Sequence, residues 1–221
     1  MNLKKIAAAA FMTVAASASY AVPTCSLHAS NVGIDAGSFS CTIVGSVITI
    51  TETYTSMGLG VVAFSEVLGS NYTVNKIVTN STGIDWTRMA NELLDRSGDA
   101  NDSLDGAQPG FVPAGFSTSN NSDGLSFDQA GSIPRTHTAF TSVFADEISD
   151  ARDFLDFFDG PVHATGATET MSFGLDSGGS GNDPFLLVQR ANESSRVPEP
   201  ATLALVGFAL AGLGLRTRRR S

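Results

Sequence analysis

The chain has 221 residues, of which 42% are hydrophobic and 16% charged, and its formal net charge is −9. An acidic chain repels phosphate backbones, so the composition disfavours binding of nucleic acid and other polyanions. A body of about 175 residues lies between two apolar ends, which suits one domain with a sizeable core.

The first 21 residues have the layout of a secretory signal peptide. Lys4 and Lys5 precede an apolar run from Ile6 to about Ala18, and small residues follow as far as Ala21. This order predicts a signal helix that signal peptidase removes after Ala21, with cleavage after Ala18 as the second choice. A retained membrane anchor is the alternative, but the run is shorter than the roughly 20 residues that span a bilayer. Signal peptidase and the export machinery are therefore the first expected partners.

Cys25 and Cys41 are the only cysteines of the chain. In an oxidising exported compartment such a pair is expected to form a disulfide, here closing a short loop near the amino end of the body. The chain-entropy model assigns about 3 kcal/mol of stabilisation to a loop of that size. A metal or redox pair is the alternative, but the spacing matches no redox motif and only His28 stands near.

Alternating side chains predict β-strands through most of the body. Apolar residues alternate with threonines between residues 48 and 54, and the same period of two recurs between 171 and 175. Turns rich in glycine, asparagine and proline separate the candidates. We therefore expect an all-β fold, a single antiparallel β-sandwich or jelly-roll-like domain over residues 22–196. Shorter strand candidates cover Val61–Val67, Tyr72–Thr79, Trp86–Leu94, Gly124–Phe127, His137–Phe144 and Phe185–Gln189.

The stretch Asp146–Phe158 fits two structures. Apolar residues recur along it at spacings of four and three, which indicates an amphipathic helix. Asp153–Phe158 followed by Gly160 and Pro161 also suits a strand that enters a hairpin with Thr168–Leu175. We expect a short helix or loop and then a strand, with the acidic residues on a solvated face. These acids are Asp146, Glu147, Asp150, Asp153, Asp156 and Asp159.

One loop carries candidate metal ligands that alternate with other residues ahead of a glycine. Calcium binds such oxygens, and the glycine permits a sharp turn. The bidentate acid expected six residues after the glycine is missing, since Val112 stands there. A polar loop without metal is the alternative, and we expect no other cofactor. The candidate calcium ligands are Asp99, Asn101, Ser103 and Asp105.

The sequence offers little that indicates catalysis. Its three histidines lie in unrelated contexts, and no serine occupies a Gly-x-Ser-x-Gly turn. Trp86, Tyr54 and Tyr72 suit either a sugar-binding platform or the core, and we expect the core. A body without enzymatic activity is the leading hypothesis. The alternative is a carbohydrate-active enzyme on a jelly roll, which needs two carboxylates roughly 5–10 Å apart.

The carboxyl end combines a proline-rich motif, an apolar run and a basic cluster. Residues 201–215 carry no charge and would form a helix of about 22 Å, against a hydrocarbon core of about 30 Å. The segment is therefore barely long enough to form a transmembrane helix.

Basic residues that follow an apolar segment stay on the cytoplasmic side of the membrane, so the body before residue 197 is expected on the opposite, outer side. The motif is Val197, Pro198, Glu199 and Pro200, and the basic tail within 216–221 holds Arg216, Arg218, Arg219 and Arg220.

These three features, in this order, resemble the PEP-CTERM sorting signal. The resemblance covers residues 197–221. It implies that a membrane-embedded exosortase recognises residues 197–200 and removes the hydrophobic tail. It also implies a Gram-negative bacterium, transient anchoring in the inner membrane, and a final place at the cell surface or in an exopolysaccharide-containing biofilm matrix. A plain tail anchor is the alternative.

Without its two end signals the chain would carry a larger negative charge. Residues 22–196 hold 7 basic and 21 acidic residues, a formal charge of −14. Such a surface favours solubility or affinity for cations. The predicted function is that of an exported surface or matrix protein with a structural, adhesive or glycan-contacting body.

Overall fold

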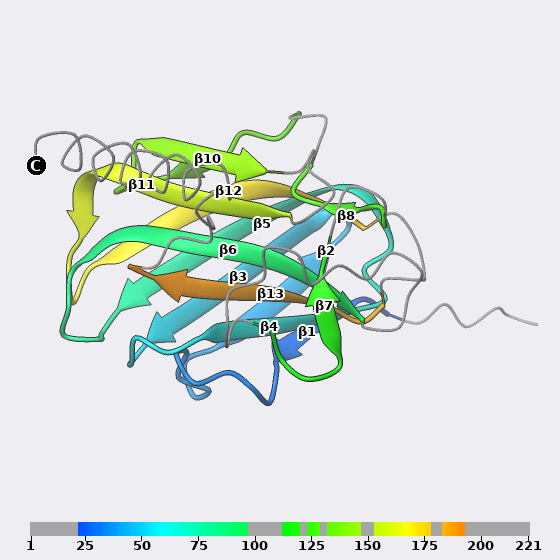
Figure 1. Ribbon diagram of the computed structural model, residues 1–221, viewed down its shortest axis with the longest axis horizontal. Coiled ribbons are helices and arrows are strands. Elements are labelled where there is room, and N and C mark those ends of the chain that lie inside the picture. Colours follow the sequence, from blue (N-terminus) through cyan, green and yellow to red (C-terminus); the bar gives the residue numbers. More distant parts are fainter. Residues whose placement is uncertain are drawn as a thin grey trace, which may run out of the picture.

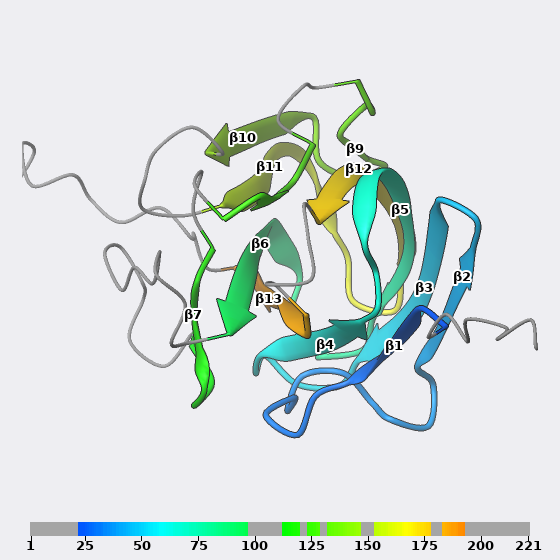
Figure 2. The same cartoon turned by 90° about the vertical axis from the view of Figure 1, so that its right-hand side faces the viewer.

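The computed structural model describes residues 22–96, 112–119, 123–128, 132–146, 153–177 and 183–192. These residues form thirteen strands and no helix, in two sheets packed face to face (Figure 1), as the end-on view in Figure 2 shows. The all-β prediction is confirmed for this part of the chain. Nowhere in these ranges is there a helix with the length and apolar character of a membrane span. The predicted signal helix and the predicted transmembrane segment 201–215 lie outside them.

The first sheet, sheet A, has seven strands. They are β1 (Thr24–Leu27), β4 (Gly60–Ser65), β6 (Trp86–Arg96), β7 (Phe116–Thr118), β10 (Ser142–Asp146), β11 (Phe154–His163) and β13 (Phe185–Ala191). The order is β1-β4-β13-β6-β11-β10, and β7 pairs with the last residues of β6. All of its pairs are antiparallel.

The second sheet, sheet B, has six strands. They are β2 (Ser40–Val44), β3 (Val47–Tyr54), β5 (Gly69–Asn80), β8 (Leu125–Ser126), β9 (Thr136–His137) and β12 (Thr168–Ser177). The order is β2-β3-β5-β12-β8, and β9 pairs with β12. β3 and β5 are parallel, so the expectation of a purely antiparallel sandwich is wrong at this pair. After β3 the chain crosses to sheet A as β4 and then returns, so β5 runs in the direction of β3.

Most of the predicted strands coincide with observed ones. The alternating segments at 48–54 and 171–175 lie in β3 and β12, and four of the shorter candidates correspond to β4, β5, β6 and β13. The candidate at Gly124–Phe127 contains β8. The candidate at His137–Phe144 is wrong as a single strand, because the backbone N–H groups of Ala139 and Phe140 donate to Nδ1 of His137 and turn the chain between β9 and β10.

The ambiguous stretch is a strand where it is described. Asp146 ends β10 and Phe154 begins β11, so neither is helical. The predicted hairpin with Thr168–Leu175 is wrong, because β11 pairs with β10 and β6 while β12 belongs to the other sheet. Gly160 and Pro161 instead lie where the register of β11 shifts, and Gly160 there has a φ of 86°, which glycine adopts without strain.

The acidic residues of that stretch do not share one solvated face. Asp153 and Asp156 are fully buried, whereas Asp159 is exposed. Burial here depends on position along the strand: residues 153–157 are buried whichever face of sheet A they point to, whereas residues 159–162, where the register shifts, are exposed. Asp153 accepts a hydrogen bond from the Ser119 hydroxyl at 2.6 Å.

The core lies between the inner faces of the two sheets. Trp86 and Tyr54 are fully buried in it, with ring centres 5.2 Å apart and rings nearly perpendicular. Tyr72 is half-buried, and its hydroxyl donates to the carbonyl oxygen of Leu68. The prediction that aromatic residues fill the core is thus confirmed for Trp86 and Tyr54. Other large buried members are Phe64, Phe127, Phe157, Phe173 and Phe185.

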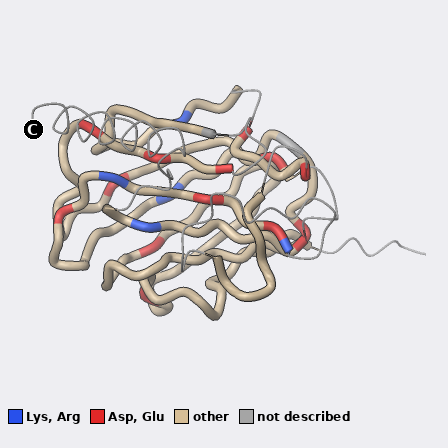
Figure 3. The backbone as a smooth tube through the Cα atoms, in the orientation of Figure 1, with Lys and Arg blue, Asp and Glu red and all other residues tan. Residues whose placement is uncertain are grey.

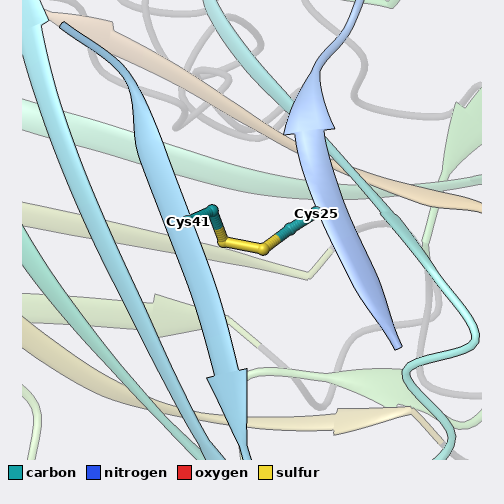
Figure 4. Close-up of a disulfide and its surroundings, with 2 residues drawn as sticks. All are labelled: Cys25 and Cys41. Carbon is teal, nitrogen blue, oxygen red and sulfur yellow. A yellow bond between two sulfur atoms is a disulfide. The ribbon is translucent and has the colours of Figure 1, made fainter. Parts of the chain in front are cut away.

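The predicted disulfide is present and joins the two sheets. Cys25 lies on β1 at the edge of sheet A, and Cys41 lies on β2 at the edge of sheet B (Figure 4). No hydrogen-bonded pairing connects β1 to β2, so the disulfide closes the sandwich along this side.

Candidate functional site

A charged pair lies in the middle of the sandwich. Glu52 on β3 and Lys76 on the neighbouring β5 are both fully buried, and Lys76 Nζ is 2.6 Å from Glu52 Oε1. Both occupy inward positions of their strands, since Lys76 stands between the buried core residues Val74 and Val78. Strand periodicity therefore sends an ammonium and a carboxylate into an apolar layer.

Two carboxamides approach this pair from sheet A. Gln189 on β13 donates from Nε2 to Glu52 Oε2 at 3.4 Å. Asn91 stands opposite Gln189 on β6, and its Nδ2 lies 3.4 Å from the Met89 carbonyl oxygen and 3.9 Å from the sulfur of Met171. We call these four residues the polar core cluster, namely Glu52, Lys76, Asn91 and Gln189.

The polar core cluster is incompletely hydrogen-bonded. Among the residues that the structure describes, Nζ of Lys76 has no hydrogen-bond partner besides its ion pair, and neither Asn91 Oδ1 nor Gln189 Oε1 has one. Burial lowers the pKa of Lys76, and the attraction of Glu52 opposes this only in part. Because a buried charge with unused donors is costly, these residues are not explained by stability alone.

One histidine, His137, borders the cluster, and a second, His163, lies near it. His137 pairs in register with Met171, which also pairs with Lys76, and the ring centre of His137 is 5.9 Å from that of His163. Two backbone N–H groups donate to Nδ1 of His137, which fixes the neutral form with the proton on Nε2. Burial, then His163 and then Lys76 lower the pKa of His137 to about 3. Burial lowers the pKa of His163 as well.

Acid is therefore expected to destabilise the body through His137. The unfolded histidine takes up a proton near pH 6.5 and the folded one near pH 3, so the free energy of unfolding falls as the pH drops through this window. We expect a loss of about 2.5 kcal/mol from this group between pH 7 and pH 4.5, because the slope approaches about 1.4 kcal/mol per pH unit below pH 6.5.

Urea unfolding at both pH values, for the parent chain and for His137→Asn, measures this effect. Carboxylates titrate in both proteins, so the difference between the two pH dependences isolates the histidine. Equal dependences would show that His137 does not titrate as described.

Two surface pockets among the described residues differ in size. One of about 170 Å³ opens beside His137, Phe140 and Phe157. Another of about 390 Å³ lies at the register shift of β11, where the Arg88 guanidinium sits 5.5 Å from the centre of the Phe158 ring. Ligand pockets commonly measure about 300–1,000 Å³, so only the second reaches that range.

The predicted site residues are placed as follows. The disulfide Cys25–Cys41 is confirmed. Ala21, the candidate calcium ligands Asp99, Asn101, Ser103 and Asp105, the motif 197–200 and the arginine tail lie outside the described residues. Within the described ranges, no group of three or more His, Cys, Asp or Glu side chains is arranged to hold a metal. Acidic residues are distributed from one end of the molecule to the other (Figure 3).

The polar core cluster was not predicted. Its signal is nevertheless present in the strand alternation, where a series of inward apolar residues is interrupted by one polar residue. Glu52 interrupts such a series on β3, Lys76 on β5 and Gln189 on β13. Extending each period-two pattern over the whole strand would have placed all three inside.

Comparison with known proteins finds one match. Residues 196–220 match the PEP-CTERM protein-sorting motif. This confirms the resemblance drawn from the proline-rich motif, the apolar run and the arginines. No match was found among curated proteins or solved structures.

Proposed function

We propose that this chain, which carries the PEP-CTERM protein-sorting motif at residues 196–220, is an exported protein that an exosortase processes at the membrane. The motif is the observation on which the proposal rests. The Cys25–Cys41 disulfide supports it independently, because such bonds persist in oxidising compartments outside the cytoplasm. Signal peptidase, the export machinery and an exosortase are the partners that this route requires.

The body, residues 22–196, serves a structural, adhesive or glycan-contacting role without enzymatic activity. Supporting this, the charged groups of the polar core cluster are sealed between the sheets and do not face a cleft. The formal charge of −14 suits a hydrated extracellular matrix. After transient anchoring in the inner membrane, the body resides at the surface or in the exopolysaccharide matrix of a Gram-negative cell.

Replacing the motif is the test of this route. In a host with an exosortase, the full chain is expected to lose its tail, so mass spectrometry of the surface-exposed protein finds a new carboxyl end near Pro198. The change of Pro198, Glu199 and Pro200 to alanine is expected to leave the tail in place, with the protein retained in the membrane fraction.

Pro134→Ala is the matched control, because it removes an exposed proline outside the motif. It should be processed like the parent chain. An intact Arg220-Ser221 end on the mature surface protein would contradict the proposal, as would normal processing of the triple variant.

A further inference from the structure

The polar core cluster brings three reactive groups together away from water. The two oxygens of the Glu52 carboxylate each receive a different nitrogen: Oε1 lies 2.6 Å from Lys76 Nζ, and Oε2 lies 3.4 Å from Gln189 Nε2. An amine and a carboxamide therefore share one carboxylate. All three side chains are fully buried.

We propose that Lys76 and Gln189 join in an intramolecular isopeptide bond, with Glu52 transferring the protons. The bond would link β5 of sheet B to β13 of sheet A through the centre of the sandwich. The proposal concerns the body alone and does not depend on how the chain is sorted.

The reaction is balanced without a cofactor. The Lys76 ammonium first gives a proton to the Glu52 carboxylate, and the neutral Nζ attacks Cδ of Gln189. Glu52 then passes its proton to Nε2 and accepts the second proton from Nζ, while the Cδ–Nε2 bond breaks. The products are one amide, one neutral Glu52 carboxylic acid and one ammonia, and no group is oxidised or reduced.

The surroundings favour this reaction. Burial lowers the pKa of Lys76, which increases the share of the nucleophilic neutral amine. Holding nucleophile and electrophile within one cluster supplies much of the entropy that the encounter would otherwise cost. The excluded water cannot compete for the carboxamide.

The driving force is the removal of buried charge. Before reaction the core holds the Lys76 ammonium and the Gln189 carbonyl oxygen Oε1, and within the described ranges neither group has a hydrogen-bond partner besides the ion pair with Glu52. Afterwards Nζ of Lys76 belongs to a neutral amide and Glu52 is a neutral carboxylic acid, so the desolvation penalty of two buried ions is gone. Departure of ammonia makes the step irreversible.

Gln189 is a better acyl group than its neighbours. The amide nitrogen of Asn91 points to the Met89 carbonyl and the Met171 sulfur and not to the carboxylate. Condensation of Lys76 with Glu52 itself would use up the proton carrier and expel water, a poorer route. The geometry thus assigns nucleophile, proton carrier and acyl donor to three separate residues.

Peptide mapping of the full chain, purified folded from the producing cells, tests the proposal. After disulfide reduction and trypsin digestion, the peptide that contains Lys76 is expected to remain uncleaved at that lysine. It should be joined to the peptide that contains Gln189, with a combined mass lower by one ammonia. Fragmentation should place the bond between the two named side chains.

Gln189→Leu is the matched variant, because it keeps the Glu52–Lys76 pair and removes the acyl group. It should yield separate peptides with cleavage after Lys76. Free Lys76 and Gln189 peptides from the folded parent chain would overturn the proposal. A loss of water located at Lys76 and Glu52 would also overturn it.

Discussion

Lys76→Met, introduced into a Gln189→Leu background where no cross-link can form, is expected to lower the free energy of unfolding by about 3–5 kcal/mol. In that background Lys76 Nζ, at 2.6 Å, is the one ion-pair partner that the described part of the chain offers to the fully buried Glu52. Its removal leaves a carboxylate inside an apolar layer without compensation. Chemical denaturation of the single and double variants measures the loss.

Adding Glu52→Leu to that protein distinguishes loss of pairing from loss of packing. An uncharged, well-packed cluster is often as stable as the ion pair that it replaces. We therefore expect the triple variant to regain most of the lost stability. If the triple variant were as unstable as the Lys76→Met, Gln189→Leu double variant, the ion pair would contribute to stability through packing and not through charge.

Trp86→Ala is expected to destabilise the body by about 3–5 kcal/mol, because it removes the largest core side chain and leaves a cavity. Trp86 is fully buried between Tyr54 and His163, with ring centres at 5.2 and 4.7 Å. Its indole N–H also donates to the Thr82 hydroxyl at 3.2 Å. Thermal and urea unfolding would record the change.

Val162→Ala is the control for this variant. Val162 is an apolar residue of β11 that is 43% exposed, so its truncation should change the stability by less than about 0.5 kcal/mol. If Trp86→Ala instead kept its stability and lost affinity for a glycan, the tryptophan would belong to a sugar-binding platform.

The strands could be predicted where one face is buried and the other polar. Alternation at 48–54 and 171–175 identified β3 and β12, because these strands line the core with every second residue. β1, β2 and β7 were missed. β1 and β7 are short, and β2 lies at a sheet edge with no fully buried residue, so their side chains leave a weak pattern.

Pairing could not be predicted from these patterns. A period of two says which face of a strand is buried but not which strand lies beside it. The parallel pair of β3 and β5, and the separation of β11 from β12, both follow from crossings between the sheets. Gly160 and Pro161 carry the signals of a turn, yet in β11 they accommodate a register shift.

The polar core cluster could not be predicted for the same reason, because its formation depends on which strands face each other. Glu52, Lys76 and Gln189 are far apart in the sequence and each resembles an ordinary surface residue in isolation. Strand phase places each one inward, but only the opposition of the two sheets brings them into contact. The disulfide was easier to predict, because two cysteines allow only one pairing.

The position of β13 has a consequence for when the body acquires its shape. β13 is the last described strand along the chain, yet it lies between β4 and β6 in the interior of sheet A. Until residues 185–191 emerge from synthesis, β4 and β6 lack the partner that both require. Contacts that close late and over long sequence separations make folding slow. On the export route proposed above, a polypeptide that completes sheet A only when its last strand is available can be threaded through a translocation channel while it is still open.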